Sequence, residues 1–259
     1  MADRVLLSAG LHNIDDCVSL ALEHHLGIEL MAFAYPHILD GQWEQVVEQY
    51  RTLLAPVGGN LTMHGPFFDM APGSIDQRIN QLTAERYQHA LRIAETLSVP
   101  LVVFHANFLV SIRTDDYRRS WQERNIKFWG EMADYAQRLG VVIAVENMWE
   151  FDPYIISDVL RRVDHPNLRA CLDVGHAHLF SQVPFDEWLD VLSPHIVHLH
   201  INNNPGDNDF HQGLHEGVLD YRQLLPKLRS LPNIPSMTLE MDKVSDMAAS
   251  LDLLELGVS

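Results

Sequence analysis

Six acidic or histidine side chains stand where apolar segments of this chain end. The clearest segment is VVIAVENMW (141–149), in which five apolar residues run directly into Glu146. A buried glutamate is rare unless it is paired or binds a metal. Five other apolar segments end in the same way, at His64, His105, Asp173, His200 and Glu240. Because imidazoles and carboxylates together suit Zn, Mn, Co or Fe(II), whereas Ca and Mg prefer oxygen alone, these residues predict a transition-metal site.

Two short clusters extend this candidate site. One is Asp173-Val-Gly-His176, just past a predicted strand, and the other is Asp209-Phe-His211 in a long polar segment. His176, Asp209 and His211 form a set of two histidines and one carboxylate, which suits a further metal ion. An ordinary loop pair is the alternative interpretation of Asp209 and His211.

Eight apolar segments with the composition of buried strands alternate with segments of helical periodicity. The predicted strands span residues 4–9, 28–34, 60–64, 100–105, 141–146, 169–174, 196–201 and 236–241. The predicted helices span about 14–25, 43–54, 75–96, 115–139, 154–163, 185–192, 221–231 and 244–256. Ser74 with Gln77 predicts a capping box for the third helix, while Asn13 and Gly27 mark the two ends of the first.

Eight strand–helix units predict an α/β fold, a single (β/α)8 TIM barrel over residues 1–259. A doubly wound open sheet is the alternative, but it does not explain polar residues at the ends of so many strands. In a barrel these carboxyl ends meet at one mouth, where we expect the metal site. Residues two positions earlier should point inward in the layer below. That layer contains Thr62, Ala144, Cys171, His198 and Thr238; three of them are polar, which predicts a hydrogen-bonded floor, and His198 is interpreted as a core histidine.

Composition and charge limit the classes of partner. The formal net charge of −17 at pH 7 disfavours binding to nucleic acid and favours a small molecule or another protein. No apolar run approaches the roughly 20 residues of a membrane span, and no signal peptide is recognisable, so a cytoplasmic protein is expected. Cys17 and Cys171 lack metal-like spacing and are interpreted as reduced and structural. The sequence leaves the oligomeric state open, a homo-oligomer included.

Taken together, the motifs resemble the xylose-isomerase-like TIM-barrel superfamily. This superfamily includes sugar and sugar-phosphate isomerases and epimerases, and AP endonucleases of the endonuclease IV type. The resemblance spans nearly the whole chain in the order of the family, through MHGPF, VFHAN, AVENM, CLDVGHAH, HLHINN, DFHQGLHEGVLDY and TLEM. It is specific for the superfamily but does not specify a reaction.

The epimerase branch of this superfamily implies one metal ion, held by Glu146, Asp173, His200 and Glu240. In that branch the metal binds two adjacent substrate oxygens, and the two glutamates remove and return a proton from opposite faces. His176 would then contact the substrate. In that branch the positions of His64 and His105 are often not histidine. The alternative interpretation of these two residues here is that they contact substrate and do not bind metal.

Two other side chains near the predicted mouth are candidates for substrate binding, Trp149 and Arg119. Arg119 belongs to a basic patch that would suit one small phosphate and contains Arg113, Arg118, Arg119 and Arg124. A solvated helix face is the alternative interpretation of this patch, and loop packing is the alternative for Trp149.

The endonuclease IV branch implies three zinc ions held by nine ligands, and this chain has a matching residue for each. The three sets would be His64, His105 and Glu146; Glu146, Asp173, His200 and Glu240; and His176, Asp209 and His211. Clustered divalent ions suit phosphoester cleavage. Against DNA as the substrate, the segment NNNPGDNDFHQ (202–212) contains no Lys or Arg.

We therefore predict an enzyme, a divalent-metal-dependent isomerase or epimerase acting on a sugar, sugar phosphate or related polyol. The expected cofactor is Zn or Mn, with Co as a further candidate, at one to three ions per chain. The alternative is a multi-zinc phosphoesterase resembling endonuclease IV. A third interpretation, a binding barrel without catalysis, has no support beyond the fact that a fold does not fix a function.

Overall fold

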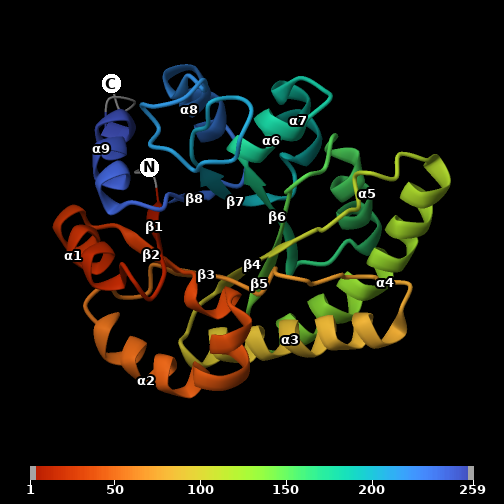
Figure 1. Ribbon diagram of the computed structural model, residues 1–259, viewed down its shortest axis with the longest axis horizontal. Coiled ribbons are helices and arrows are strands. Elements are labelled where there is room, and N and C mark those ends of the chain that lie inside the picture. Colours follow the sequence, from red (N-terminus) through yellow and green to blue (C-terminus); the bar gives the residue numbers. More distant parts are fainter. Residues whose placement is uncertain (1–3, 256–259) are drawn as a thin grey trace.

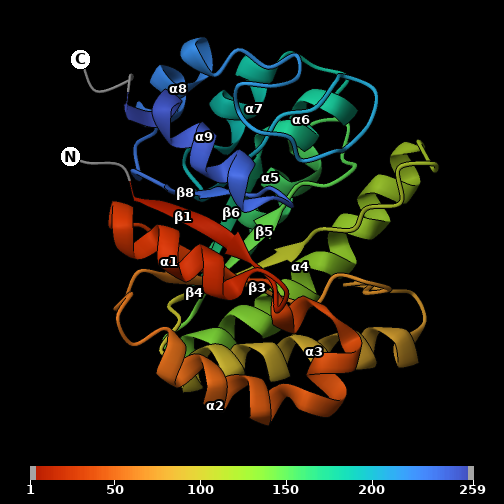
Figure 2. The same cartoon turned by 60° about the vertical axis from the view of Figure 1, so that its left-hand side comes forward.

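The computed structural model describes residues 4–255, and within this range eight parallel strands close a barrel. Each strand pairs with the next along the chain, and β1 pairs with β8 to close the sheet, as Figures 1 and 2 show. The strands are β1 (Val5–Ala9), β2 (Gly27–Leu30), β3 (Leu61–His64), β4 (Leu101–His105), β5 (Val142–Glu146), β6 (Leu168–Asp173), β7 (Ile196–Ile201) and β8 (Ser236–Leu239). The predicted (β/α)8 barrel is therefore confirmed.

Helices surround the barrel on its outside (Figure 1). They are α1 (Ile14–His24), α2 (Trp43–Leu53), α3 (Gln77–Thr96), α4 (Asp115–Arg138), α5 (Tyr154–Val163), α6 (Val174–Phe180), α7 (Phe185–Leu192), α8 (Tyr221–Arg229) and α9 (Val244–Glu255). Most predicted boundaries agree within one or two residues. The predicted end of the last helix, at Leu256, lies outside the described residues. Among the described helices, none is both long and apolar enough to span a membrane.

Several local predictions were wrong. The second strand ends at Leu30 rather than at residue 34, because residues 32–34 form a 3-10 turn followed by a π-helical turn at 38–42. The side chain of Asp76, not of Ser74, caps α3 by accepting from the amides of residues 78 and 79. Helix α1 ends at His24, with His25 in the left-handed conformation, so Gly27 is free to begin β2.

Helix α6 was missed, and its position matters for the site. It begins at Val174, directly after β6, although Val174 was predicted as the last residue of that strand.

Asn13 does precede α1 as predicted, but its side chain caps nothing in the helix and accepts from the amide of Gly10. Local sequence does not show whether such a side chain bonds to the amides of the helix or to the turn before it, because the same polar group can do either.

The apolar core lies between the barrel and the surrounding helices, whereas the barrel interior is largely polar. A small separate cluster inside the barrel consists of Val103, Ala144 and Cys171. Cys17 and Cys171 are both buried and unpaired, as predicted. Burial raises the pKa of the Cys17 thiol to about 12, with a contribution from the charge of Asp16, so this thiol is unreactive at neutral pH.

Candidate metal centre

Three groups of ligand-type side chains meet at the carboxyl ends of the strands. Within each group, one ligand atom from every residue lies within 4.8 Å of the others. The groups are His64, His105 and Glu146; Glu146, Asp173, His200 and Glu240; and His176, Asp209 and His211. The structure thus brings together all the residues that the sequence predicted as metal ligands. Glu146 belongs to two groups, which makes it the centre of the arrangement.

The Glu146 carboxylate faces two groups with two different oxygens. Its Oε2 lies 3.3 Å from His64 Nε2 and 3.2 Å from His105 Nε2. Its Oε1 lies 3.1 Å from His200 Nδ1, and this nitrogen is also 3.1 Å from Glu240 Oε2. The side chain is wholly buried. A carboxylate placed in this way could bridge two cations.

Asp173 joins the end of β6 to the start of α6. Its Oδ1 accepts from the backbone amide of His176 at 2.6 Å, which caps the helix, and its Oδ2 accepts from Asn202 Nδ2 at 2.9 Å. Asn147, one residue past β5, exchanges two hydrogen bonds with the backbone of Asp173, at 2.9 and 3.0 Å. These bonds fix the strand end, and the first turn of α6 then carries His176 over the site.

The loop after β7 supplies Asp209 and His211. Asn203 holds this loop: its side chain donates to the carbonyls of Leu214 and Leu219, and its backbone pairs with that of Gln212. His211 has a φ of 44°, in the left-handed region that is uncommon for residues other than glycine. The loop is therefore built around an unfavourable backbone conformation at a candidate ligand, which is typical of functional sites.

Three histidines of the centre are oriented by backbone carbonyls. The Nδ1 atoms of His64, His176 and His211 lie 2.8, 3.0 and 3.1 Å from the carbonyl oxygens of Gly65, Asn147 and Glu240. A carbonyl can only accept, so each Nδ1 carries the proton and each Nε2 is left to face a carboxylate. Fixing the ring in this way is how proteins prepare histidines for metal binding.

The residues fit a divalent cation by a test that is independent of resemblance. Buried polar atoms are almost always hydrogen-bonded. Yet Glu146 Oε2, Glu240 Oε2 and Asp209 Oδ1 are buried without a hydrogen-bond partner among the described residues. Each of the three groups contains at least one of these oxygens. Each of these oxygens lies within 3.3 Å of an imidazole nitrogen of the centre but accepts no well-directed hydrogen bond from it, an arrangement that suits a metal ion.

Burial and charge shift the pKa values of the candidate ligands in opposite directions. Burial alone lowers the pKa of His176, but the neighbouring carboxylates of Asp173 and Asp209 raise it to about 10. Burial raises the pKa of Asp173 to about 6, with the charge of Glu240 adding to the effect. For Glu240, burial raises the pKa, but the positive charges of His200 and His211 outweigh it and bring the pKa to about 2. Metal binding must therefore displace protons from the imidazoles.

The shifted pKa of His176 predicts a pH-dependent stability of the metal-free protein. A pKa raised from 6.5 to about 10 on folding stabilises the fold below about pH 6.5, and this stabilisation is lost as the pH rises towards 10. We expect wild type to melt above His176→Gln near pH 6.5 in the presence of chelator, with the difference shrinking up to pH 10. Thermal melts at several pH values check this. A difference that grows with pH would contradict it.

The layer below the centre is hydrogen-bonded, as the sequence predicted, but its key residue was missed. Thr62, His198 and Thr238 all point into the barrel and bond to Glu29 on β2. Glu29 is wholly buried and pairs in register with Thr62. The available signal was a lone carboxylate between Ile28 and Leu30, in the middle of an apolar strand. His198, interpreted as a core histidine, is buried with partners on both ring nitrogens.

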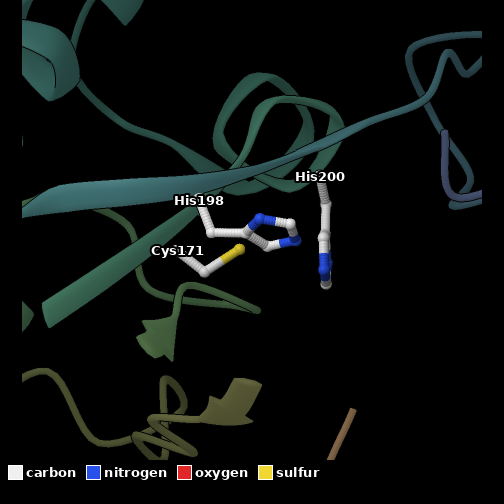
Figure 3. Close-up of side chains that lie close together, drawn as sticks. All are labelled: Cys171, His198 and His200. Atoms are coloured by element: carbon white, nitrogen blue, oxygen red, sulfur yellow. The ribbon is translucent and has the colours of Figure 1, made fainter. Parts of the chain in front are cut away.

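Figure 3 shows a further group, in which Cys171, His198 and His200 point to the same side of β6 and β7. The three could hold a metal by distance alone. However, both ring nitrogens of His198 and Nε2 of His200 already bond to Ser236 or Glu29, which are outside the candidate ligand groups. Burial also raises the pKa of the Cys171 thiol, which disfavours the thiolate that a metal requires. We therefore assign this group to the hydrogen-bonded floor.

A cavity of about 260 Å³ lies beside the centre. Its lining contains Glu240, Asp209 and His211, together with residues of β1 and of the loops after β1, β2 and β3. The predicted substrate-binding residues Trp149 and Arg119 are not among the described residues that line this cavity. Arg119 pairs with Asp116 on α4, with 68% of its side chain exposed. Trp149 is 45% exposed.

Comparison with known proteins agrees with the fold. The TTHB071 protein from Thermus thermophilus, studied after soaking with ZnCl2, is 28% identical, with 98% of this chain and 97% of that chain covered and a TM-score of 0.83. A D-tagatose 3-epimerase-like protein is 22% identical over 98% and 97% of the two chains, with a TM-score of 0.82. The uncharacterized protein MJ1311 of Methanocaldococcus jannaschii is 26% identical over 75% of this chain and 69% of its own length.

The fold and the site define a parallel α/β barrel with groups that could bind divalent metal at its strand ends. The family model described as xylose isomerase-like TIM barrel matches residues 20–256. The chain belongs to this family, and the resemblance seen in its motifs is confirmed.

Proposed function

We propose that this protein is a metal-dependent isomerase or epimerase acting on a small polyhydroxylated molecule such as a sugar. One observation carries the proposal: two buried carboxylates from β5 and the end of β8 converge, and one of them opens on a cavity. Glu146 Oε1 and Glu240 Oε2 each lie 3.1 Å from His200 Nδ1. Glu240 also lines the cavity of about 260 Å³. Two carboxylates at one substrate position can remove and return a proton.

Glu146, Asp173, His200 and Glu240 would hold the essential divalent ion. Bound there, the ion would supply Lewis-acid polarisation of substrate oxygens and so make a neighbouring C–H bond more acidic. In this proposal Glu240, which lines the cavity, would take that proton. Glu146, which is wholly buried, would return a proton. Because both carboxylates are almost wholly buried, little water competes for the proton.

The lining of the cavity favours a neutral substrate. Ser8, His12 and Asn13 offer hydrogen bonds, and Tyr35 and Phe67 offer apolar faces. No Lys or Arg is found among the described residues that line it. In the predicted basic patch, Arg118 makes a two-fold ion pair with Asp152, and Arg119 pairs with Asp116. A sugar hydroxyl is therefore better matched than a phosphate, although a sugar phosphate could extend out of the cavity.

The decisive experiment follows solvent deuterium. The metal-loaded protein is incubated with ketoses and aldoses in D2O, and the products are examined by NMR and mass spectrometry. We expect a new isomer or epimer that carries deuterium at the carbon next to the carbonyl. Absence of both conversion and exchange across a broad set of sugars, with metal bound, would reject the proposal.

The exposed position of Arg119 predicts that this residue contributes little to substrate binding. Since its guanidinium faces solvent and pairs with Asp116, we expect Arg119→Ala to change KM by no more than about twofold, as for most surface substitutions. Steady-state kinetics on the identified substrate provide the measurement. A tenfold rise in KM, specific to a phosphorylated substrate, would instead support the phosphate-binding role.

A second function, a multi-zinc phosphoesterase, is favoured by the shared position of Glu146 and by unpaired buried oxygens in every group. With all three groups occupied, His64, His105, His176, Asp209 and His211 would hold ions rather than contact substrate. Zinc-loaded protein should then cleave generic phosphodiesters or abasic-site DNA. Cleavage without any deuterium exchange into sugars would replace the first proposal by this one.

A further inference from the structure

His200 differs from three other histidines of the centre in what holds its ring. His64, His176 and His211 each donate to a backbone carbonyl through Nδ1. His200 is held through its other nitrogen and by a side chain, because its Nε2 lies 2.9 Å from Glu29 Oε1. Its Nδ1 is consequently the atom that faces Glu146 and Glu240. The orientation of His200 therefore depends on a side chain, which a substitution can change, and not on a backbone carbonyl.

Glu29 is itself fixed by partners from three other strands. Its Oε2 accepts from Thr62 Oγ1 on β3 at 2.8 Å, from Thr238 Oγ1 on β8 at 2.6 Å and from His198 Nε2 on β7 at 2.8 Å. His198 is held in turn, since its Nδ1 lies 2.7 Å from Ser236 Oγ. Glu29 Oε1 is left for His200 Nε2. A carboxylate with donors on both oxygens cannot rotate without losing bonds, so its position in the barrel is well defined.

We propose that Glu29 is a positioning residue of the metal centre. An ionised carboxylate is only an acceptor, so His200 Nε2 must carry a hydrogen, and in the neutral ring it is then Nδ1 that has the lone pair a metal ion needs. The bond also fixes the plane of the ring and raises the basicity of Nδ1. Glu29 is not among the described residues that line the cavity, so it acts through His200 and not on substrate. The inference rests on the proposed metal site but not on the reaction.

A purely structural role for Glu29 makes a different prediction. If Glu29 only connects β2 to three other strands, its substitution would lower the stability of the metal-free protein and leave metal affinity and metal geometry unchanged. A positioning role requires that affinity and geometry change, even where the variant remains folded. The two roles are therefore separated by measuring metal binding alongside stability, without any assay of turnover.

The test compares Glu29→Gln with the matched control Thr62→Val, which is nearly the same shape. The control removes one donor to Glu29 Oε2 and leaves the bond from His200 to Oε1 intact. Dissociation constants for Co²⁺ and Mn²⁺ are measured by competition with a chelating dye, and the Co²⁺ complexes by visible absorption. We expect Glu29→Gln to weaken binding roughly 10- to 100-fold and to change the Co²⁺ spectrum, while Thr62→Val stays near wild type. Equal affinity and spectrum in wild type and Glu29→Gln overturns the proposal.

A second measurement needs no variant and covers the case in which Glu29→Gln fails to fold. In wild type with ¹⁵N-labelled histidine and bound Zn²⁺, long-range proton–nitrogen correlations should show a protonated Nε2 and a metal-bound Nδ1 for His200. The reverse arrangement overturns the proposal. If wild type binds no divalent metal, the proposed function and this inference fall together. If only the affinity of Glu29→Gln is unchanged, the inference alone is rejected.

Discussion

Replacing Glu240 by glutamine should lower kcat by about a thousandfold or more, within the upper part of the range for loss of a general acid or base. Glu240 is the one of the two central carboxylates that lines the cavity, and its Oε2 is buried without a hydrogen-bond partner among the described residues. Glutamine keeps the size of the side chain and an oxygen ligand but cannot accept a proton. The loss should therefore appear in kcat, with part of the metal affinity retained.

The measurement pairs steady-state kinetics with metal analysis of the same sample. Glu216→Gln is a matched control, because it makes the same chemical change in the loop after β7 on a side chain that is 44% exposed. The control should keep wild-type turnover. Glu146→Gln should also lose turnover. If one of the two variants still exchanges substrate hydrogen for deuterium without forming product, the glutamate that this variant retains is the one that removes the proton. Full activity in both Glu240→Gln and Glu146→Gln would exclude proton transfer between them.

Removing the divalent metal should have an effect of similar size. The candidate ligands of the central group are almost wholly buried, so without a cation the carboxylates and imidazoles can balance only one another. Loss of Lewis-acid polarisation costs several kcal/mol of transition-state stabilisation, which corresponds to at least about a thousandfold in rate. We expect dialysis against a chelator to abolish turnover and added Mn²⁺, Co²⁺ or Zn²⁺ to restore it.

The number of equivalents that restores activity separates the two candidate functions. If the central group alone is essential, activity recovers with about one ion per chain, and His64→Ala with His105→Ala still recovers under the same titration. If activity recovers only with two or three zinc ions and is lost in the double variant, the full ligand set is in use. Elemental analysis of protein purified without chelator gives the starting occupancy. Turnover that is unaffected by complete metal removal would contradict both functions.

The sequence by itself determined the barrel and the candidate ligands. Apolar segments alternate eight times with helical periodicity, and six of them end in a histidine or carboxylate. Since carboxyl ends of parallel strands meet at one mouth, residues from His64 to Glu240 could be assigned to one site without knowing any distance. The inward layer below followed from the two-residue period of a strand, which correctly placed Thr62, His198 and Thr238.

Only the tertiary structure decided how these residues are connected. Whether Glu146 faces one group or two depends on strand order and register, which connect β3 to β7 around the barrel through β4, β5 and β6. Whether Arg119 faces the cavity depends on the rotation of α4, and the sequence pattern left both faces of that helix open. Glu29 was missed for the same reason: a single carboxylate in an apolar strand has no partner in its own segment. Its donors come from three other strands, and a pattern along one chain segment contains no information about contacts between segments that only folding brings together.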